Sequence, residues 1–414
     1  MKSMRFMLLM LLCFSYMYAE NIKVGILHSL SGTMSMSEQS VVNSTLLAID
    51  EINGDGGVLG RKIEPIIKDG ASNWNTFAKE AQNLITKDKV NVVFGCWTSA
   101  SRKTVKPVFE KYNHLLFYPV QYEGLESSPN IIYTGAAPNQ QIIPAVKWAM
   151  DTIGKRFYLV GSDYVFPHSA NAIMKNQIKS LKGEVLAEKY ILLGSSDVEN
   201  IVEDIANKRP DIILNTINGD TNVAFFKALR KRGITPNVIP TISFSIAEAE
   251  LKAMATESFE GDYAAWNYFQ SIESDKNKNF IQAFKKRYGA QSVITDPMEA
   301  AYIGVHLWAQ AVKIANTTEL QDVKSALKNL SFAAPEGPVS VDTKSNHIWK
   351  NVRIGQIQKD GQFKIIWSTS KPVRPMPYPT YRTKEEWDKF LNALYIRWDK
   401  NWANMHLTPS NGEL

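Results

Sequence analysis

The sequence contains little cysteine, no long run of like charges and, after its first 20 residues, no long apolar stretch. The two cysteines among 414 residues, Cys13 and Cys96, are too few for a disulfide framework. The 47 basic and 41 acidic residues are interspersed, which excludes a dedicated nucleic-acid-binding arm. No later segment is apolar enough for a membrane anchor. At about 100–200 residues per domain, the length predicts two or three globular domains.

Residues 1–19 have the pattern of a secretory signal peptide. A basic start is followed by an apolar run at residues 6–13, and the stretch ends at Ala19 before a polar residue. The apolar core is shorter than the about 20 residues that span a bilayer. Cleavage at Cys13 would give a lipid-anchored form, but Leu12 before it is larger than lipoprotein cleavage prefers. We therefore predict cleavage after Ala19 and export to the periplasm.

Short apolar runs alternate with helical patterns along the rest of the chain. Residues 22–27 are typical of a buried strand, and a capping box at residues 35–38 is expected to start the next helix. Strands rich in Val, Ile and Leu between helices indicate parallel sheets covered on both faces, so the expected class is α/β with two similar lobes. The further predicted strands are 62–68, 90–94, 115–118, 157–161, 185–192, 211–216 and 238–242, with a hairpin at 352–368. The further helices are 77–86, 101–112, 168–181, 198–208, 222–232, 280–288, 299–315, 320–330 and 384–398.

The motifs of the common α/β enzymes are missing. The sequence has no P-loop, no GxGxxG after a strand and no GxSxG nucleophile elbow. The glycines at residues 54–60 follow a helix and precede a strand, which fits a helix stop and a turn rather than a phosphate cradle. The six histidines are scattered and form no HExxH pattern. We predict no cofactor and no metal site.

Cys96 is the best candidate for a catalytic nucleophile. It follows the predicted strand 90–94, and α/β proteins place their sites at such strand ends. A thiol amidase would also need a base and an oxyanion hole, and the sequence marks neither. The prediction is therefore a protein that is not an enzyme, with an exported amide hydrolase using Cys96 as the alternative.

Aromatic and polar side chains gather after four predicted strands, at residues 97–102, 117–124, 162–167 and 215–220. Two lobes whose strand ends face one another would enclose a ligand between these clusters. Ser99 fits a ligand contact and a helix cap equally well, and the aromatic residues also fit a hydrophobic core.

These segments carry a resemblance to a known family. GILHSLSG at residues 25–32 and AIDEINGDGGVLGRKIEPIIKDG at 48–70 resemble the type I periplasmic substrate-binding proteins of ABC transporters, the leucine/isoleucine/valine-binding class. The similarity extends from about residue 22 to residue 380, and the export signal favours transport over the cytoplasmic amide-sensing regulators. Five blocks resemble the urea-transport and short-chain-amide branch more closely: GCWTSASRK (95–103), LLFYPVQYEGLE (115–126), YTGAAPNQQ (133–141), GSDYVFP (161–167) and NTINGD (215–220).

The resemblance implies two Rossmann-like lobes joined by three crossovers, with the ligand cleft between the lobes. The crossovers are expected near residues 137–139, 266–268 and 341–343. The N-terminal lobe would then comprise residues 20–138 and 267–342, and the C-terminal lobe residues 139–266 and 343–414.

The resemblance also implies a ligand site at the strand ends. Its residues are aromatic, hydroxyl-bearing, amide-bearing or apolar, and no cation is among them. The amide-sensing relatives have Thr-Pro where this chain has Val120 and Gln121, so their hydrogen-bond pattern does not carry over. Asp163 and Asp220 lie nearby in sequence and fit caps equally well. The implied ligand-binding residues are Trp97, Ser99, Tyr118, Pro119, Val120, Gln121, Tyr164, Phe166, Thr216, Asn218 and Ser243.

Such a residue set suits urea, which is neutral, flat and rich in N–H donors. A free amino acid would need a carboxylate partner for its ammonium group and donors for its carboxylate. We therefore predict a periplasmic protein that binds urea and delivers it to the membrane permease subunits of an ABC transporter, with no nucleic-acid partner. Short-chain amides are the alternative ligands, and branched-chain amino acids are a more distant one.

Overall fold

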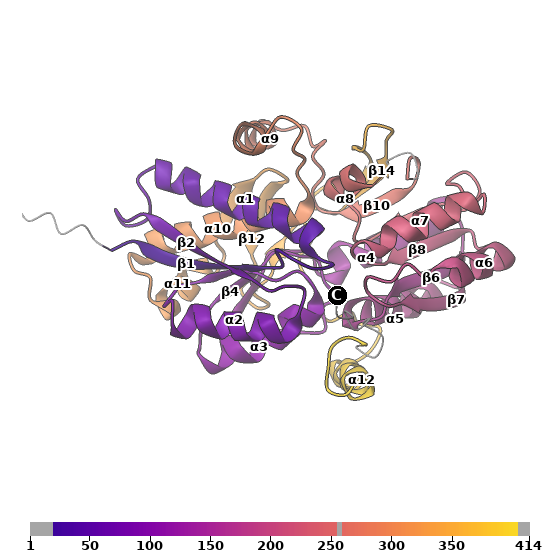
Figure 1. The fold of residues 1–414 in the computed structure, drawn as a ribbon, viewed down its shortest axis with the longest axis horizontal. Coiled ribbons are helices and arrows are strands. Elements are labelled where there is room, and N and C mark those ends of the chain that lie inside the picture. Colours follow the sequence, from indigo (N-terminus) through magenta and orange to yellow (C-terminus); the bar gives the residue numbers. More distant parts are fainter. Residues whose placement is uncertain (1–19, 255–258, 405–414) are drawn as a thin grey trace, which may run out of the picture.

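The chain forms two α/β lobes that lie side by side, with the C-terminal helix α12 (Lys384–Arg397) beneath their junction (Figure 1). The computed structural model describes residues 20–254 and 259–404. The predicted signal peptide at residues 1–19, with Cys13, lies outside the described residues. In the described part of the chain, no helix has the length and apolar character needed to cross a membrane.

The first lobe is built on a five-stranded parallel sheet in the order β2-β1-β3-β4-β5. Helices α1 (Ser35–Gly54) and α10 (Asp296–Ala315) cover one face, and α2 (Trp74–Thr86) and α3 (Ser99–Lys111) cover the other (Figure 1). An apolar stripe of α1 packs here, since Val42, Ile49 and Ile52 share one buried cluster with residues of α10. The strands are β1 (Ile22–His28), β2 (Ile63–Asp69), β3 (Val93–Gly95), β4 (Leu116–Tyr118) and β5 (Ile131–Tyr133).

The second lobe holds a seven-stranded sheet in the order β15-β14-β10-β9-β8-β6-β7. Its central strands are parallel, and the hairpin predicted at residues 352–368 is confirmed as an antiparallel edge. Helices α4 (Ile142–Thr152) and α5 (Val165–Ser180) pack on one face, whereas α6 (Glu199–Lys208), α7 (Thr221–Lys231) and α8 (Glu248–Ala253) pack on the other. The strands are β6 (Arg156–Ser162), β7 (Glu184–Ile191), β8 (Ile212–Thr216), β9 (Thr241–Ser243), β10 (Tyr263–Trp266), β14 (Arg353–Ile357) and β15 (Phe363–Ser368).

The elements between β10 and β14 return to the first lobe. Helices α9 (Asp275–Tyr288), α10 and α11 (Leu320–Leu327) are followed by a small antiparallel sheet of β11 (Ser331–Ala334), β12 (Gly337–Val341) and β13 (Ile348–Trp349). The α/β architecture predicted from the sequence is confirmed by this arrangement.

The third passage between the lobes comes later than the predicted position near residues 341–343. The Asp342 carboxylate accepts hydrogen bonds from the backbone N–H groups of Lys344 (3.1 Å) and Ser345 (3.0 Å), which closes a turn. The turn sends β13 back along β12, and the chain enters the second sheet only at Arg353.

The side chain of Asn267 ties the three passages together. Its Nδ2 donates to the carbonyl oxygens of Gln140 (2.8 Å) on the first passage and Asn351 (2.6 Å) on the third. Asn267 itself lies on the second passage, where its backbone N–H donates to the Asp296 carboxylate at 2.9 Å. The three passages are therefore linked to one another by hydrogen bonds at the junction of the lobes.

The capping box expected at residues 35–38 is absent. Helix α1 has Met34 at its N-cap, and no side chain caps it. Glu38 is fully buried and accepts instead from the Ser29 backbone N–H and the His28 Nδ1, each at 2.9 Å. Glu38 therefore joins the start of α1 to the end of β1 rather than to its own first turn.

Candidate ligand-binding site

A cavity of about 160 Å³ lies between the carboxyl ends of the two sheets. Each of its lining residues is between 1% and 4% exposed, so the two lobes are closed over it. The empty space is too narrow to admit a sphere the size of a water molecule, so even a very small ligand requires the lining side chains to move apart. The residues that line it are Trp97, Ser99, Val120, Gln121, Tyr164, Phe166 and Asn218, and the sequence predicted all seven as ligand-binding residues.

Trp97 and Ser99 reach the cavity from the junction of β3 and α3. The N-cap of α3 is Thr98, whose hydroxyl accepts from the Ser101 backbone N–H at 3.0 Å. Ser99 is therefore not the cap, which was the competing interpretation of its position. The Tyr118 hydroxyl donates to the Trp97 carbonyl oxygen at 2.5 Å and holds this turn against β4.

Two buried polar atoms of the lining residues have no hydrogen-bond partner among the described residues. They are the Trp97 Nε1, a donor, and the Gln121 Oε1, an acceptor. The other end of the same amide, Gln121 Nε2, donates across the junction to the Phe244 carbonyl oxygen at 2.8 Å. An unpaired buried polar group costs about 1–3 kcal/mol, so these two atoms mark where a polar ligand would be favourable.

The second lobe supplies Tyr164, Phe166 and Asn218. The rings of Tyr164 and Phe166 lie tilted with their centroids 6.3 Å apart. Burial raises the pKa of Tyr164 well above its ordinary value, so its hydroxyl keeps its proton. The Asn218 backbone N–H donates to the Ser162 hydroxyl at 3.0 Å, which fixes the loop after β8 against the end of β6. This lobe therefore presents two aromatic walls and one amide.

Four predicted site residues, Tyr118, Pro119, Thr216 and Ser243, are buried but do not line the cavity. The Tyr118 hydroxyl is occupied by Trp97, as described above. The Thr216 hydroxyl lies within hydrogen-bond distance of the Val160 carbonyl oxygen (3.1 Å), and the Ser243 hydroxyl accepts from Asn215 at 3.2 Å. Their positions at or next to strand ends predicted that they lie near the cavity. Because side-chain direction alternates along a strand, the hydroxyls of Thr216 and Ser243 point into the lobe instead.

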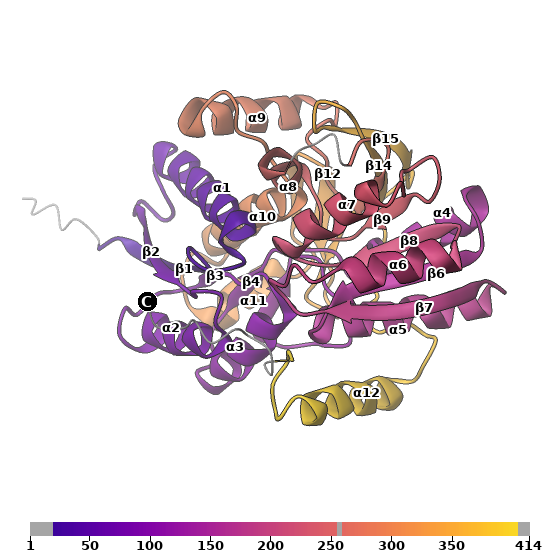
Figure 2. The same ribbon diagram turned by 45° about the vertical axis from the view of Figure 1, so that its right-hand side comes forward.

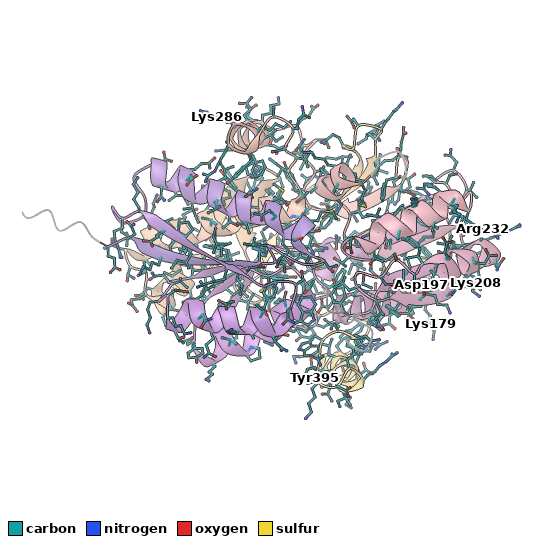
Figure 3. All side chains as sticks on the ribbon, viewed as in Figure 1. Lys179, Asp197, Lys208, Arg232, Lys286 and Tyr395 are labelled. Atoms are coloured by element: carbon teal, nitrogen blue, oxygen red, sulfur yellow. The ribbon has the colours of Figure 1, made fainter. Side chains whose placement is uncertain are left out.

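None of the residues lining the cavity carries a charge. The Asp163 carboxylate is bonded to His168 Nε2 (2.7 Å) and Asn404 Nδ2 (2.7 Å), and Asp220 stands at the N-cap position of α7 without capping it. On the outer end of the second lobe, charged side chains such as Lys208 and Arg232 extend into solvent, away from the junction (Figure 3). The cavity is thus an uncharged region within a charged protein.

Cys96 lies beside the site but does not line it. The residue is fully buried and takes a left-handed backbone conformation, with φ of 69°. Burial raises the pKa of its thiol well above the ordinary value. Since the thiolate is the nucleophilic form of cysteine, this environment disfavours the nucleophilic role considered from the sequence.

A buried ionic cluster behind Ser99 was not predicted from the sequence. Arg102 donates to the Ser99 hydroxyl (3.0 Å), to Glu123 Oε1 (3.1 Å) and to Glu126 Oε1 (2.9 Å). Lys103 donates to Glu126 Oε2 at 3.0 Å, so two cations balance two carboxylates. The available signal was the placement of these charges, because the two cations lie in the block at residues 95–103 and the two carboxylates in the block at residues 115–126.

The C-terminal segment lies against both lobes. Helix α12 runs below α3 and α5 (Figure 2). Beyond it, the Trp402 carbonyl oxygen accepts from the Val165 backbone N–H at 2.9 Å, and the Lys103 ammonium sits 4.9 Å from the centre of the Trp402 ring. This segment therefore supports the loop that carries Tyr164.

Two parallel-sheet lobes closed over a buried cavity at their strand ends define a bilobal ligand-binding protein. A family model described as "Periplasmic binding protein domain" matches residues 22–384. The chain therefore belongs to the periplasmic binding protein family.

Two curated relatives differ in how much of the chain they match. "Leu/Ile/Val-binding protein homolog 6" of Brucella melitensis biotype 1 is 23% identical over 357 residues, which cover 84% of this chain and 90% of that protein. A protein of Geobacillus stearothermophilus named "Limonene hydroxylase" is 34% identical over 127 residues, which cover 31% of this chain but only 23% of that protein. The relative matched over most of its length is thus a binding protein.

Solved structures show the same fold. The solute-binding protein of an ABC transporter from Rhodopseudomonas palustris HaA2, in complex with p-hydroxybenzoic acid, superposes with a TM-score of 0.78 at 23% identity, covering 85% of this chain and 98% of that one. A leucine-binding protein from Thermotoga maritima MSB8 gives a TM-score of 0.74 at 18% identity, covering 84% and 98%.

Proposed function

We propose that this protein binds urea in the cavity between its lobes and delivers it to the permease subunits of an ABC transporter. The observation that carries the proposal is the cavity itself: it is small, closed and uncharged, and its lining residues include an unpartnered donor and an unpartnered acceptor. Urea offers its carbonyl oxygen to the donor, Trp97 Nε1, and its N–H groups to the acceptor, Gln121 Oε1. Export to the periplasm by the N-terminal signal belongs to the same proposal.

The size and charge of the cavity favour urea over the ligands named for similar structures. Leucine and hydroxybenzoate are both larger than urea, and both carry a carboxylate. A buried carboxylate needs a cation or several N–H donors, and no cation lines this cavity of about 160 Å³. Short-chain amides share the neutral amide group and remain the second candidate, because acetamide replaces one NH₂ group of urea by a methyl group.

The affinity expected for so small a ligand is modest. The best very small ligands gain at most about 1.5 kcal/mol per heavy atom, which gives urea roughly 6 kcal/mol. That corresponds to a dissociation constant on the order of tens of micromolar. Approaching this limit requires nearly every N–H group and the carbonyl of urea to be paired.

Isothermal titration calorimetry of the purified protein tests the assignment. We expect urea to bind in the micromolar range, acetamide more weakly because its methyl group leaves acceptors unpaired, and leucine not measurably. Trp97→Ala removes one wall of the cavity and a donor, and should weaken urea binding at least about tenfold. Ser99→Ala should weaken urea binding by a comparable factor.

Trp148→Ala is the matched control, because Trp148 packs on Tyr263 of the second lobe and does not line the cavity. Its urea affinity should stay close to that of the wild type. Leucine binding more tightly than urea would overturn the proposed ligand. Equal urea affinities of the Trp97→Ala and wild-type proteins would overturn the proposed site.

Gly135 offers a second test, because it packs against the peptide group that joins two lining residues. A Cβ at Gly135 would lie 2.1 Å from the carbonyl carbon and oxygen of Val120. We expect Gly135→Ala to push Val120 and Gln121 out of position and to weaken urea binding about tenfold or more. Gly54→Ala is the control, since a Cβ there meets no atom within 4 Å. Unchanged urea affinity in a folded Gly135→Ala protein would show that this peptide does not shape the binding site.

A further inference from the structure

The hydroxyl of Ser99 has only one orientation open to its proton. A serine hydroxyl holds one donor and two acceptor positions, a guanidinium can only donate, and a carboxylate can only accept. Arg102 Nη1 donates to the Ser99 oxygen at 3.0 Å, and the Ser99 hydroxyl donates to Glu123 Oε2 in a short hydrogen bond. Arg102 therefore uses one lone pair of the Ser99 oxygen, and Glu123 takes the Ser99 proton. Only the second lone pair, an acceptor position, remains for a ligand in the cavity that Ser99 lines.

The pair that imposes this orientation is itself held in place. Arg102 is fully buried, and its guanidinium lies 4.8 Å and 4.3 Å from the ring centres of Tyr118 and Tyr122. Its Nη2 donates to Glu123 Oε1 at 3.1 Å, so the two oxygens of this carboxylate have different partners. Rotation of Glu123 or Arg102 would break a buried ion pair, which is strongly unfavourable.

We infer that Arg102 and Glu123 are positioning residues that fix the Ser99 hydroxyl as a hydrogen-bond acceptor toward the ligand, and that the site thereby selects ligands presenting N–H groups over ligands presenting oxygen. The Gln121 Oε1, which has no partner among the described residues, adds a second acceptor from the same lobe. For urea this inference rests on the proposed function. The direction of the Ser99 proton does not depend on it.

Glu123→Gln is expected to reverse the polarity of Ser99. The glutamine must turn its oxygen toward Arg102 Nη2, because two donors facing one another would repel. Its Nε2 then donates to the Ser99 oxygen, which already accepts from Arg102, so the serine proton turns toward the cavity. A urea N–H group would then meet a donor instead of an acceptor.

A double-mutant cycle measured by calorimetry with urea tests the coupling. Glu123→Gln should weaken urea binding about tenfold or more, and should have less than about a twofold effect in the Ser99→Ala background, where no hydroxyl is left to orient. Glu126→Gln is the matched control. Glu126 is also buried and also bonded to Arg102, but its carboxylate accepts from Arg102 Nε and Lys103 Nζ rather than from Ser99, so its effect should be the same in both backgrounds. Equal effects of Glu123→Gln in the two backgrounds would refute the positioning role.

Neutron diffraction from deuterium-exchanged crystals of the wild-type protein gives a second, ligand-independent result. A deuteron on the line between the Ser99 oxygen and Glu123 Oε2 supports the inference, and a deuteron directed into the cavity overturns it, whatever the urea affinity. Conversely, a protein that shows the deuteron on the Glu123 side but does not bind urea would refute the proposed ligand and leave the orientation of Ser99 in place.

Discussion

Replacing Arg102 with alanine is expected to lower the free energy of unfolding by about 3–5 kcal/mol, because it leaves buried carboxylates without their cation. Arg102 contacts Glu123 and Glu126, which are at most 4% exposed. The cations Arg102 and Lys103 hold the pKa of Glu126 well below its ordinary value against the opposing effect of burial. Denaturation by guanidinium chloride, which avoids urea as a ligand, measures the loss.

Arg232→Ala supplies the comparison for this prediction. Arg232 donates to Glu203 at 2.8 Å, but both side chains are about half exposed, and such surface pairs contribute about 1 kcal/mol or less. If Arg102→Ala lowers the free energy of unfolding no more than Arg232→Ala does, the buried ionic cluster around Arg102 does not stabilise the first lobe as proposed.

The sequence allowed the α/β order to be predicted because most strands are continuous apolar runs and most helices carry an apolar stripe. Several of the elements that were not predicted are too short for such a pattern. Strands β5 and β10 have three and four residues, and β13 has two, which is too few to show a periodicity. Helix α4 does carry a helical stripe of buried residues, from Ile142 to Met150, but it was not predicted, and Pro144 lies within it.

The lining of the cavity could be predicted because parallel strands bring their carboxyl ends together, and because the resemblance selected the segments after those ends. Sequence position did not show which side chains face the cavity, as Tyr118 and Thr216 illustrate. The ionic cluster was missed for a different reason. Charged residues are mostly exposed, and the partners of Arg102 lie more than 20 positions away in the chain, so their pairing exists only in three dimensions.

The second large effect is expected at Glu248, where stability should depend on pH. Glu248 is 1% exposed, accepts from the Gln270 backbone N–H at 2.8 Å, and has no partner for its second oxygen among the described residues. Burial raises its pKa to about 8, with Glu250 and Asp296 adding to the shift. In the unfolded chain a glutamate titrates near pH 4.3, so between these two values the folded protein binds a proton that the unfolded chain releases.

The sign of the pH dependence follows from this difference. The stabilisation linked to the Glu248 proton is fully present below about pH 4.3 and is lost as the pH rises toward about 8. Glu248→Gln keeps an oxygen for the Gln270 N–H and has no proton to lose. Its stability relative to the wild type should therefore increase between pH 5 and pH 8, by up to roughly 4 kcal/mol at about 1.4 kcal/mol per pKa unit.

Guanidinium chloride denaturation of both proteins at several pH values between 5 and 8 measures this difference. Glu184→Gln is the control, because the Glu184 side chain is 66% exposed and its replacement should give the same difference at every pH. A pH-independent difference for Glu248→Gln would mean that Glu248 is already ionised when folded, and hence that water or a cation reaches its second oxygen. An increase toward pH 8 would instead establish that the folded protein keeps a neutral carboxylic acid beside the backbone passage from β10 to α9 at pH values where an exposed glutamate is ionised.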